Sequence, residues 1–362
     1  MKIYVLPLVA LASLAINASA TSIANECSGP VDVPIASPAS CSGEYARTTP
    51  PAGAIVVDIT GKHEGSFKTV TEAMASISNT TEVTTVFILP GTYHEQVVVD
   101  KLKSPLVIQG YTCNTMKYSE NQVTITQAKA QADLPVEIKQ NRNFLTSTMG
   151  FKSESGVKVY NLNVANTAGE IQKDGQAVAV YVDNTDYGFY ACNFTGFKSV
   201  VGANKGRELY AKSYFHGADN IVFGRHAMAW FESCDIETIS KGSITSHGNQ
   251  NESIKSEYVF SKANVFGSEK NLTMLGTPWG EYARVVFQEC KLSDVVNPKG
   301  WKASEEVNST ETVYFKEFKN TGPGAKFDQR VEFSGQLDMA KKMTETLGEG
   351  ISNYWWVDSK FL

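Results

Sequence analysis

The spacing of hydrophobic residues changes near residue 80 of this chain. Before that point, apolar residues recur with the i, i+3, i+4, i+7 spacing of one helix face. They are Val70, Ala73, Met74 and Ile77. Thr69 followed by Glu72 has the spacing of a capping box in front of this face. The segment is therefore predicted to form a short amphipathic helix.

From Val83 onward, the chain consists of short runs rich in β-branched residues, such as TTVFI, LVIQGY and VKVYNLNV. Gly, Asn, Asp and Pro separate these runs, and no helical spacing lies between them. This pattern predicts an all-β fold, and it leaves a repeat structure, a sandwich and a barrel as alternatives.

An internal repeat separates these alternatives. Three segments share one spacing of aromatic, small and apolar residues, in steps of 21 residues, and a fourth copy follows an inserted stretch. The copies are Phe189-Cys192-Phe194, Tyr210-Ser213-Phe215, Phe231-Cys234-Ile236 and Phe287-Cys290-Leu292. A period near 20 residues with strand-like content is typical of a solenoid, in which each turn buries its apolar residues against its neighbours.

The solenoid period also bears on the cysteines. Equivalent residues on adjacent turns lie about 4.8 Å apart, so Cys192 and Cys234, two turns apart, are expected about 9.6 Å from each other. A disulfide requires Cα atoms within about 7 Å. Cys192 and Cys234 are therefore expected to be buried free thiols.

The N-terminal region shows no such periodicity. Residues 1–20 have the charge, apolar run and small-residue end of a signal peptide, and the apolar run is too short to span a membrane. Residues 21–52 are predicted to form an extended arm tied by a Cys27–Cys41 disulfide, and residues 53–362 to form the folded domain. The sequence offers no pairing argument for Cys113 or Cys290.

The C-terminal segment DMAKKMTETL carries Met339, Met343 and Leu347 on one helical face. It is predicted to form a helix that packs against the outside of the coil. An aromatic tail is expected to pack there as well: Tyr354, Trp355, Trp356 and Phe361.

The net charge of −5, or −6 without Lys2, argues against general binding of nucleic acid or anionic membranes. An anionic ligand would need a local cluster of cations. Five Asn-x-Ser/Thr sequons are possible glycan sites in a secreted chain: Asn79, Asn193, Asn251, Asn271 and Asn308.

Several blocks at matching spacing resemble fungal pectin methylesterases (pectinesterases). They include GSFKTVTEA, ILPGTYHEQV, FYACNFTGF and LGTPWGEYARVVFQ, and the match runs from about Pro50 to the C-terminus. The resemblance implies an all-β, single-stranded, right-handed parallel β-helix of the pectin-lyase-like kind, with short flanking helices. It also implies a secreted monomer that acts on pectin (homogalacturonan), without cofactor or metal.

In active members of this family, two aspartates one coil apart act as acid/base and nucleophile. An arginine holds the nucleophile, and two glutamines stabilise the oxyanion. At the matching positions of this chain, Gln176 keeps the first glutamine, whereas Lys198 and Ser199 replace the Gln-Asp pair. Asn220 replaces the nucleophile and Thr277 the arginine.

Neighbouring residues do not obviously replace this chemistry. In a regular strand, Asp219 and Lys198 would point away from the cleft, because consecutive residues face opposite sides. Ser199 would need a base, and we expect His216 and His226 to be structural. Loss of the nucleophilic acid and of its arginine together leaves a neutral site, which avoids an unpaired buried charge.

Three hypotheses follow. The first is a pectin-binding protein with little or no catalysis, in which Trp279 (equally consistent with core or cleft) contacts the polysaccharide, and Lys198 does so if the local backbone lets it reach the cleft. The second is an esterase that uses rearranged residues, and the third a hydrolase with Ser199 as nucleophile. Three further cations are either part of a binding patch or ordinary solvated residues: Lys205, Arg207 and Lys212.

Overall fold

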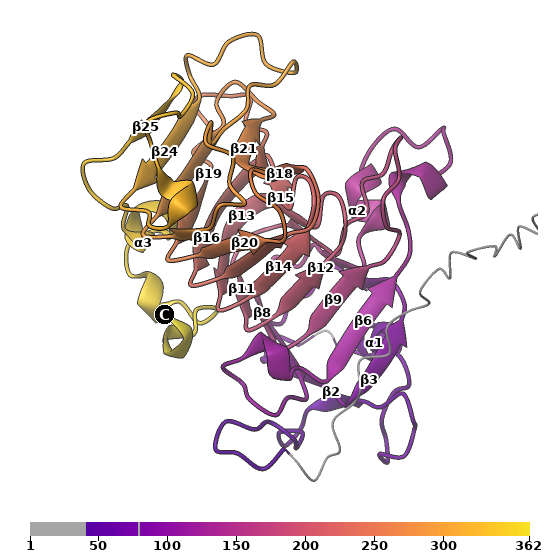
Figure 1. Cartoon of the computed structure of the whole chain (residues 1–362). Helices are drawn as coiled ribbons and strands as arrows, with labels where there is room; N and C mark the ends of the chain where they lie inside the picture. Colours follow the sequence, from indigo (N-terminus) through magenta and orange to yellow (C-terminus); the bar gives the residue numbers. More distant parts are fainter. Residues whose placement is uncertain (1–40, 79) are drawn as a thin grey trace, which may run out of the picture. The chain divides into compact units, whose positions relative to one another are not determined.

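The computed structural model describes residues 41–78 and 80–362. The expected signal peptide, Cys27 and the sequon at Asn79 lie outside the described residues. Parallel strands follow one another in coils, and equivalent strands of successive coils pair (Figure 1). This is the right-handed parallel β-helix that the resemblance implies.

The strands of the described chain form three ladders. The first ladder contains β1 (Ile55–Val57), β2 (Thr84–Ile88), β5 (Leu106–Gly110), β8 (Val157–Tyr160), β11 (Tyr187–Tyr190), β13 (Val201–Ala211), β16 (His226–Glu232), β19 (Glu257–Ser261), β22 (Arg284–Gln288), β24 (Tyr314–Phe318) and β25 (Ser334–Gln336). The second contains β4 (Val97–Val99), β7 (Met149–Phe151), β10 (Val180–Asp183), the start of β13, β15 (Val222–Gly224), β18 (Gly242–His247) and β21 (Thr273–Pro278). The third contains β3 (Gly91–His94), β6 (Val123–Gln127), β9 (Asn163–Asn166), β12 (Asn193–Thr195), β14 (Tyr214–Gly217), β17 (Asp235–Thr238), β20 (Asn264–Gly267) and β23 (Lys291–Leu292).

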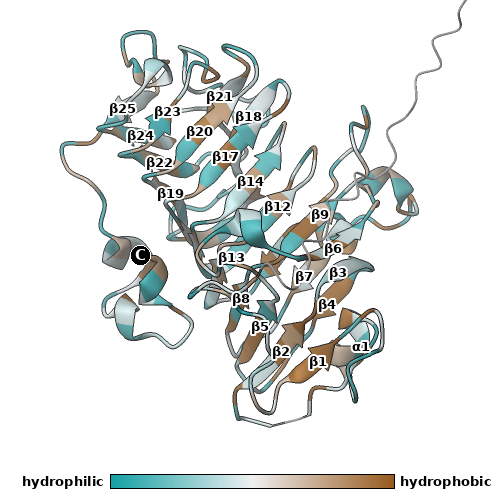
Figure 2. Cartoon of the chain, turned by 60° about the horizontal axis from the view of Figure 1, so that its bottom comes forward, coloured by the Kyte–Doolittle hydropathy of each residue, from teal (hydrophilic) through white to brown (hydrophobic). Residues whose placement is uncertain are grey.

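The predicted N-terminal helix is confirmed as α1 (Val70–Ala75), and the capping box of Thr69 and Glu72 is present. The helix ends before Ile77. It contacts β1 and β4, whose hydrophobic colouring is visible in Figure 2, and so covers apolar residues of the first coils. The other α-helices of the described ranges are short: α2 (Arg142–Thr146) and α3 (Met343–Leu347). None of the described helices is both long and apolar enough to cross a bilayer.

The 21-residue repeat is an aromatic stack inside the coil. Phe189 and Tyr210 stack with ring centroids 4.8 Å apart, and Tyr210 and Phe231 repeat this distance. The stretch that interrupts the repeat in the sequence contributes its own member, Phe260, which lies 4.3 Å from Phe231 and 4.5 Å from Phe287. The stretch therefore adds one coil to the stack, in steps of 29 and 27 residues in place of 21.

Cys192 and Cys234 are buried free thiols, as predicted, and so is Cys290. The residue before each of them has a left-handed backbone, for example Ala191 with φ of 48° and Ser233 with φ of 53°. These residues turn the chain from the first ladder into the third. Because the turn comes at the same place in each coil, the spacing between the aromatic residue before it and the apolar residue after it is constant.

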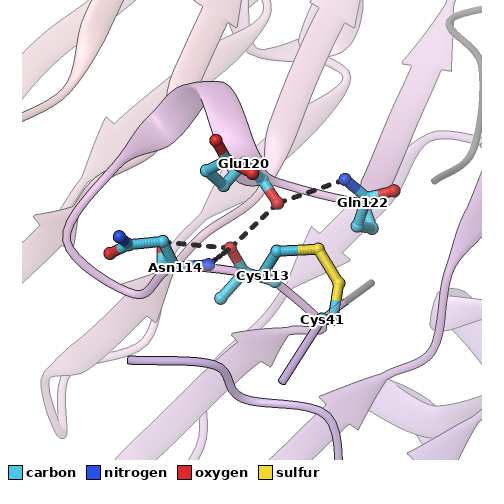
Figure 3. Close-up of a disulfide and its surroundings, with 6 residues drawn as sticks. Cys41, Cys113, Asn114, Glu120 and Gln122 are labelled. Carbon is cyan, nitrogen blue, oxygen red and sulfur yellow. Dashed lines mark hydrogen bonds between the residues drawn. A yellow bond between two sulfur atoms is a disulfide. The ribbon is translucent and has the colours of Figure 1, made fainter. Parts of the chain in front are cut away.

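The predicted Cys27–Cys41 disulfide is wrong, because Cys41 bonds to Cys113 (Figure 3). Residues after Cys41 run antiparallel to the segment before Cys113, with Arg47 bridging Thr112. The Cα atoms of Cys41 and Cys113 lie 4.5 Å apart across a sequence separation of 72 residues. The partner of Cys41 is therefore not the cysteine nearest to it in the sequence.

The C-terminal segment packs against the outer face of the first ladder, beside β8 and β11 (Figure 1). Trp356 and Phe361 are buried there, as expected of the aromatic tail. The predicted helix is shorter than expected, since α3 begins at Met343. Met339 lies outside it and is 73% exposed, so its placement on a buried face is wrong.

Candidate active site

The two positions that match the catalytic aspartates lie at a corner where the third ladder passes into the second. Ser199 and Asn220 both have left-handed backbones, with φ angles of 62° and 51°. Lys198 pairs with Asp219 in a parallel bridge, and the amide of Ser199 donates to the carbonyl of Asp219 at 2.9 Å. Positions 21 residues apart therefore stack on neighbouring coils here, as the period predicts.

The assumption of regular strands at this corner is wrong. Residues 198–199 and 219–220 lie outside the strands, and a left-handed residue interrupts the alternation of faces. Lys198 and Asp219 share one side because they are in-register partners, and Nζ lies 3.8 Å from Oδ2 with the two side chains 34% and 32% exposed. Lys198 thus has an acidic partner, which the sequence argument did not anticipate.

Thr277 occupies the position of the expected arginine. Its Oγ1 lies 2.6 Å from the hydroxyl of Ser243, and the amide of Ser243 donates to Oδ1 of Asp219 at 3.1 Å. Thr277 is therefore linked through Ser243 to Asp219 rather than to Asn220. A pair of neutral hydroxyls stands where the family pattern places a guanidinium.

The other matched residues offer only neutral groups. Oε1 of Gln176 is buried and has no hydrogen-bond partner among the described residues. The backbone next to it is fixed to the corner, because the amide of Ala177 donates to the carbonyl of Lys198 at 3.0 Å. Ser199 is 3% exposed, and Asn220 is half-buried.

Neither candidate histidine is placed as a base for Ser199. Burial lowers the pKa of His216, opposed by nearby Glu237, and its Nδ1 is buried without a partner. Burial also lowers the pKa of His226, and the charge of Arg225 adds to this effect. Neither ring hydrogen-bonds to Ser199 within the described structure.

Two rows of residues run along the second ladder beside this corner. Along each strand, the side chains of these rows alternate with side chains that point into the core, such as those of Val180 and Val222. The first row, matched by strand register, consists of Tyr181, Gly202, Phe223, Ser246 and Thr277. The second row lies two residues beyond the first, mostly past the strand ends, and consists of Asn204, Arg225, Gly248 and Trp279. At its edge, a bulge in β13 pairs Asp183 with Lys205.

Trp279 lies in the second row and is half-buried, so it belongs to this face and not to the core. The guanidinium carbon of Arg225 lies 4.2 Å from its ring centroid. A Cβ atom on Gly248 would lie 2.4 Å from Cε3 of Trp279 and 3.1 Å from Cγ of Arg225. Glycine at position 248 is therefore required for Arg225 to reach Trp279 across the intervening coil.

The structure places the three further cations, Lys205, Arg207 and Lys212, in three different regions. Lys205 is exposed and pairs in register with His226, at the edge of the second row. Arg207 instead forms an ion pair of 2.6 Å with Asp186 and stacks beside the C-terminal segment. Lys212 lies at the corner between the first and third ladders. Only Lys205 can extend a cationic patch on this face.

Sequence reasoning missed Arg225, Tyr181 and Phe223. Their signal was present in the period of two along IVFGR and AVYVD, where apolar inward residues alternate with these side chains. Tyr181 lies over Gly202, and burial raises its pKa.

Comparison with known proteins identifies the family. The sequence profile described as Pectinesterase matches residues 54–348. A pectinesterase of Aspergillus aculeatus is 38% identical over 325 residues, which cover 87% of this chain and 94% of that protein.

Solved structures agree with this match. The pectin methylesterase of Aspergillus niger has a TM-score of 0.78 and 29% identity, covering 87% of this chain and all of that one. The pectin methylesterase from carrot, at 24% identity and a TM-score of 0.69, has the same fold. With its profile match over most of its length and its coil of parallel strands, the chain belongs to the pectinesterase family.

Proposed function

We propose that this protein binds pectin and that its esterase activity is absent or severely reduced. The observation that carries the proposal is the neutral pair at the corner, where Ser199 and Asn220 stand at the two positions matched to catalytic carboxylates. Thr277, bonded to Ser243, offers no cation at the third position.

The magnitudes favour strong impairment. General acid–base catalysis contributes about 10²- to 10⁴-fold, and an amide such as Asn220 is a poor nucleophile. Gln176 and substrate positioning would leave a residual rate several orders of magnitude below that of an intact site.

The scaffold of a binding face remains. Tyr181 and Trp279 expose aromatic surface in the two rows, and Lys198 adds a cation at the corner. Aromatic rings pack against the apolar faces of sugars, and cations pair with uronate carboxylates. These groups support retention of pectin without turnover.

Methanol release from methyl-esterified pectin tests the proposal. Wild type should release no more methanol than a heat-treated control, while being retained on a pectin column. A variant with Lys198→Gln, Ser199→Asp, Asn220→Asp and Thr277→Arg should gain activity. Methanol release by wild type at a rate above about 1 s⁻¹, a typical lower value for enzymes, would contradict the proposal.

The ion pair at the corner favours one second candidate, an esterase with rearranged residues. Asp219 provides a carboxylate one residue from the nucleophile position, and Lys198 lies 3.8 Å from it. If wild type does release methanol, Asp219→Asn should abolish this activity and Ser199→Ala should leave it unchanged. Loss of activity in Ser199→Ala alone would point instead to the serine hydrolase hypothesis.

We also propose that the protein is a secreted monomer. Secretion is supported by the signal-like residues 1–20 and by the Cys41–Cys113 disulfide, since disulfides persist in oxidising compartments. The monomer is carried over from the family resemblance. Exposed sequons at Asn251, Asn271 and Asn308 are the candidate glycan sites. The mass of the protein in culture medium, before and after glycosidase treatment, and its elution volume test these points.

A further inference from the structure

Arg225 is a cation without an acidic partner on the binding face. Its guanidinium carbon lies over the ring of Trp279, 4.2 Å from the centroid, and its Nη1 donates a single long hydrogen bond, of 3.4 Å, to Oε1 of Gln250. It forms no ion pair with any carboxylate of the described residues. A guanidinium carries five N–H donors, so most of its hydrogen-bonding capacity remains unused.

The nearby acid forms no ion pair with Arg225 in the described part of the chain. Asp183 pairs in register with Lys205 and accepts a hydrogen bond of 2.9 Å from the side-chain amide of Asn204. After the larger effect of burial, the charges of Arg225 and Lys205 both lower the pKa of His226, and the single carboxylate of Asp183 opposes them. The charge around the second row is therefore locally positive, although the chain as a whole is acidic.

The position of Arg225 is fixed before any ligand arrives. The indole of Trp279 supports one face of the guanidinium, and the absence of a side chain at Gly248 allows this close approach. A stacked guanidinium keeps its N–H edge free, and less rotamer entropy is lost when it forms hydrogen bonds. This is the arrangement expected of a site for a planar carboxylate.

We propose that Arg225 binds the free carboxylate of a de-esterified galacturonate unit, so that this protein prefers the acid form of the polysaccharide to its methyl ester. The inference rests on the proposed pectin-binding function and extends it to the chemical form that is bound. A free carboxylate accepts two parallel hydrogen bonds from the guanidinium and pairs with its charge. A methyl ester has no charge and keeps only a weak carbonyl acceptor.

Binding of two oligogalacturonates of equal length, one unesterified and one fully methyl-esterified, tests this inference by calorimetry. Wild type should bind the unesterified oligomer at least tenfold more tightly, as expected for hydrogen bonds to a charged group. Arg225→Gln should remove most of this difference and leave the affinity for the ester within about twofold. Arg225→Lys keeps the positive charge but cannot donate two parallel hydrogen bonds from one planar group. Its preference for the unesterified oligomer should therefore be intermediate.

Arg284→Gln is the matched control. Arg284 also stacks on an aromatic ring, 4.5 Å from the centroid of Tyr314, but it lines a separate pocket of about 520 Å³. Its replacement should leave both affinities unchanged. An equal loss in this variant would overturn the assignment to Arg225 and move the ligand to that pocket.

The remaining outcomes separate the two proposals. If wild type binds both oligomers equally, or if Arg225→Gln keeps the preference while retaining the wild-type melting temperature, the inference is wrong and pectin binding stands. If wild type binds neither oligomer, the proposed function fails, and the inference fails with it.

Discussion

The hydroxyl of Tyr210 donates a hydrogen bond of 2.6 Å to Oε2 of Glu208 inside the coil, while Oε1 of the same carboxyl has no partner. Burial raises the pKa of Glu208 well above its ordinary value, and the hydrogen bond from Tyr210 only partly opposes this. In the unfolded chain this group ionises near pH 4.3. Stability should therefore fall as pH rises above about 4.3, because the unfolded state loses its proton first.

Glu208→Gln should remove this dependence. The amide keeps an acceptor for Tyr210 but cannot ionise, so the variant should gain stability relative to wild type by up to about 1.4 kcal/mol per pH unit above pH 4.3. Urea unfolding at several pH values between 4.5 and 8 measures the difference. Glu289→Gln, at an exposed position, is the control. A constant difference across this range would contradict the prediction.

His247 should have the opposite dependence on pH. It is fully buried, its Nδ1 accepts a hydrogen bond of 3.0 Å from the amide of Arg284, and burial lowers its pKa to about 3. The unfolded state gains a proton near pH 6.5, so stability present above that value is lost as pH falls toward 3. In wild type the midpoint of unfolding should decrease between pH 6.5 and 4. His247→Gln should reduce this decrease, whereas His63→Gln, at an exposed position, should leave it unchanged.

The Cys41–Cys113 disulfide closes a long loop. Its sequence separation of 72 residues corresponds to about 4 kcal/mol of stabilisation in the chain-entropy account. Reduction, or replacement of both cysteines by serine, should lower the free energy of unfolding by an amount of this order. Mass spectrometry of the non-reduced digest should find the Cys41–Cys113 peptide pair. Recovery of a Cys27–Cys41 pair instead would show that the arm is tied differently.

Phe260 should be among the most sensitive core positions. It lies between Phe231 and Phe287, with centroid distances of 4.3 and 4.5 Å. Phe260→Ala leaves a cavity in this stack and should cost about 3–5 kcal/mol in the free energy of unfolding. Phe266→Ala, on the outer side of the same coil, should cost much less. Similar decreases in the free energy of unfolding of both variants would contradict the prediction that the aromatic stack contributes more than packing on the outer side.

The sequence predicted the features that recur along the chain. The step from Phe189 to Tyr210 and on to Phe231 revealed the coil, and the same period placed residues 198–199 beside 219–220. The pattern could not reveal what depends on local backbone geometry. The left-handed residues Ser199 and Asn220 invalidate an argument based on alternating faces.

Long-range pairing was also beyond the sequence. Cys41 bonds to Cys113, 72 residues away, beside an antiparallel bridge between Arg47 and Thr112, and no local sequence pattern predicts this contact. The Arg225–Trp279 contact likewise joins residues on different coils, and it depends on the missing side chain of Gly248. Such contacts follow from tertiary register, which a single sequence does not display.

The corner at Ser199 and Asn220 is held by main-chain hydrogen bonds, including those from Ser199 to Asp219 and from Ala177 to Lys198. These two bonds use main-chain atoms alone, whereas a third, from the amide of Ser243, ends on the side chain of Asp219. Exchange of the side chains at positions 199 and 220 therefore leaves the two main-chain bonds between adjacent coils in place. The proposed loss of hydrolysis is thus compatible with a fully formed coil at this corner.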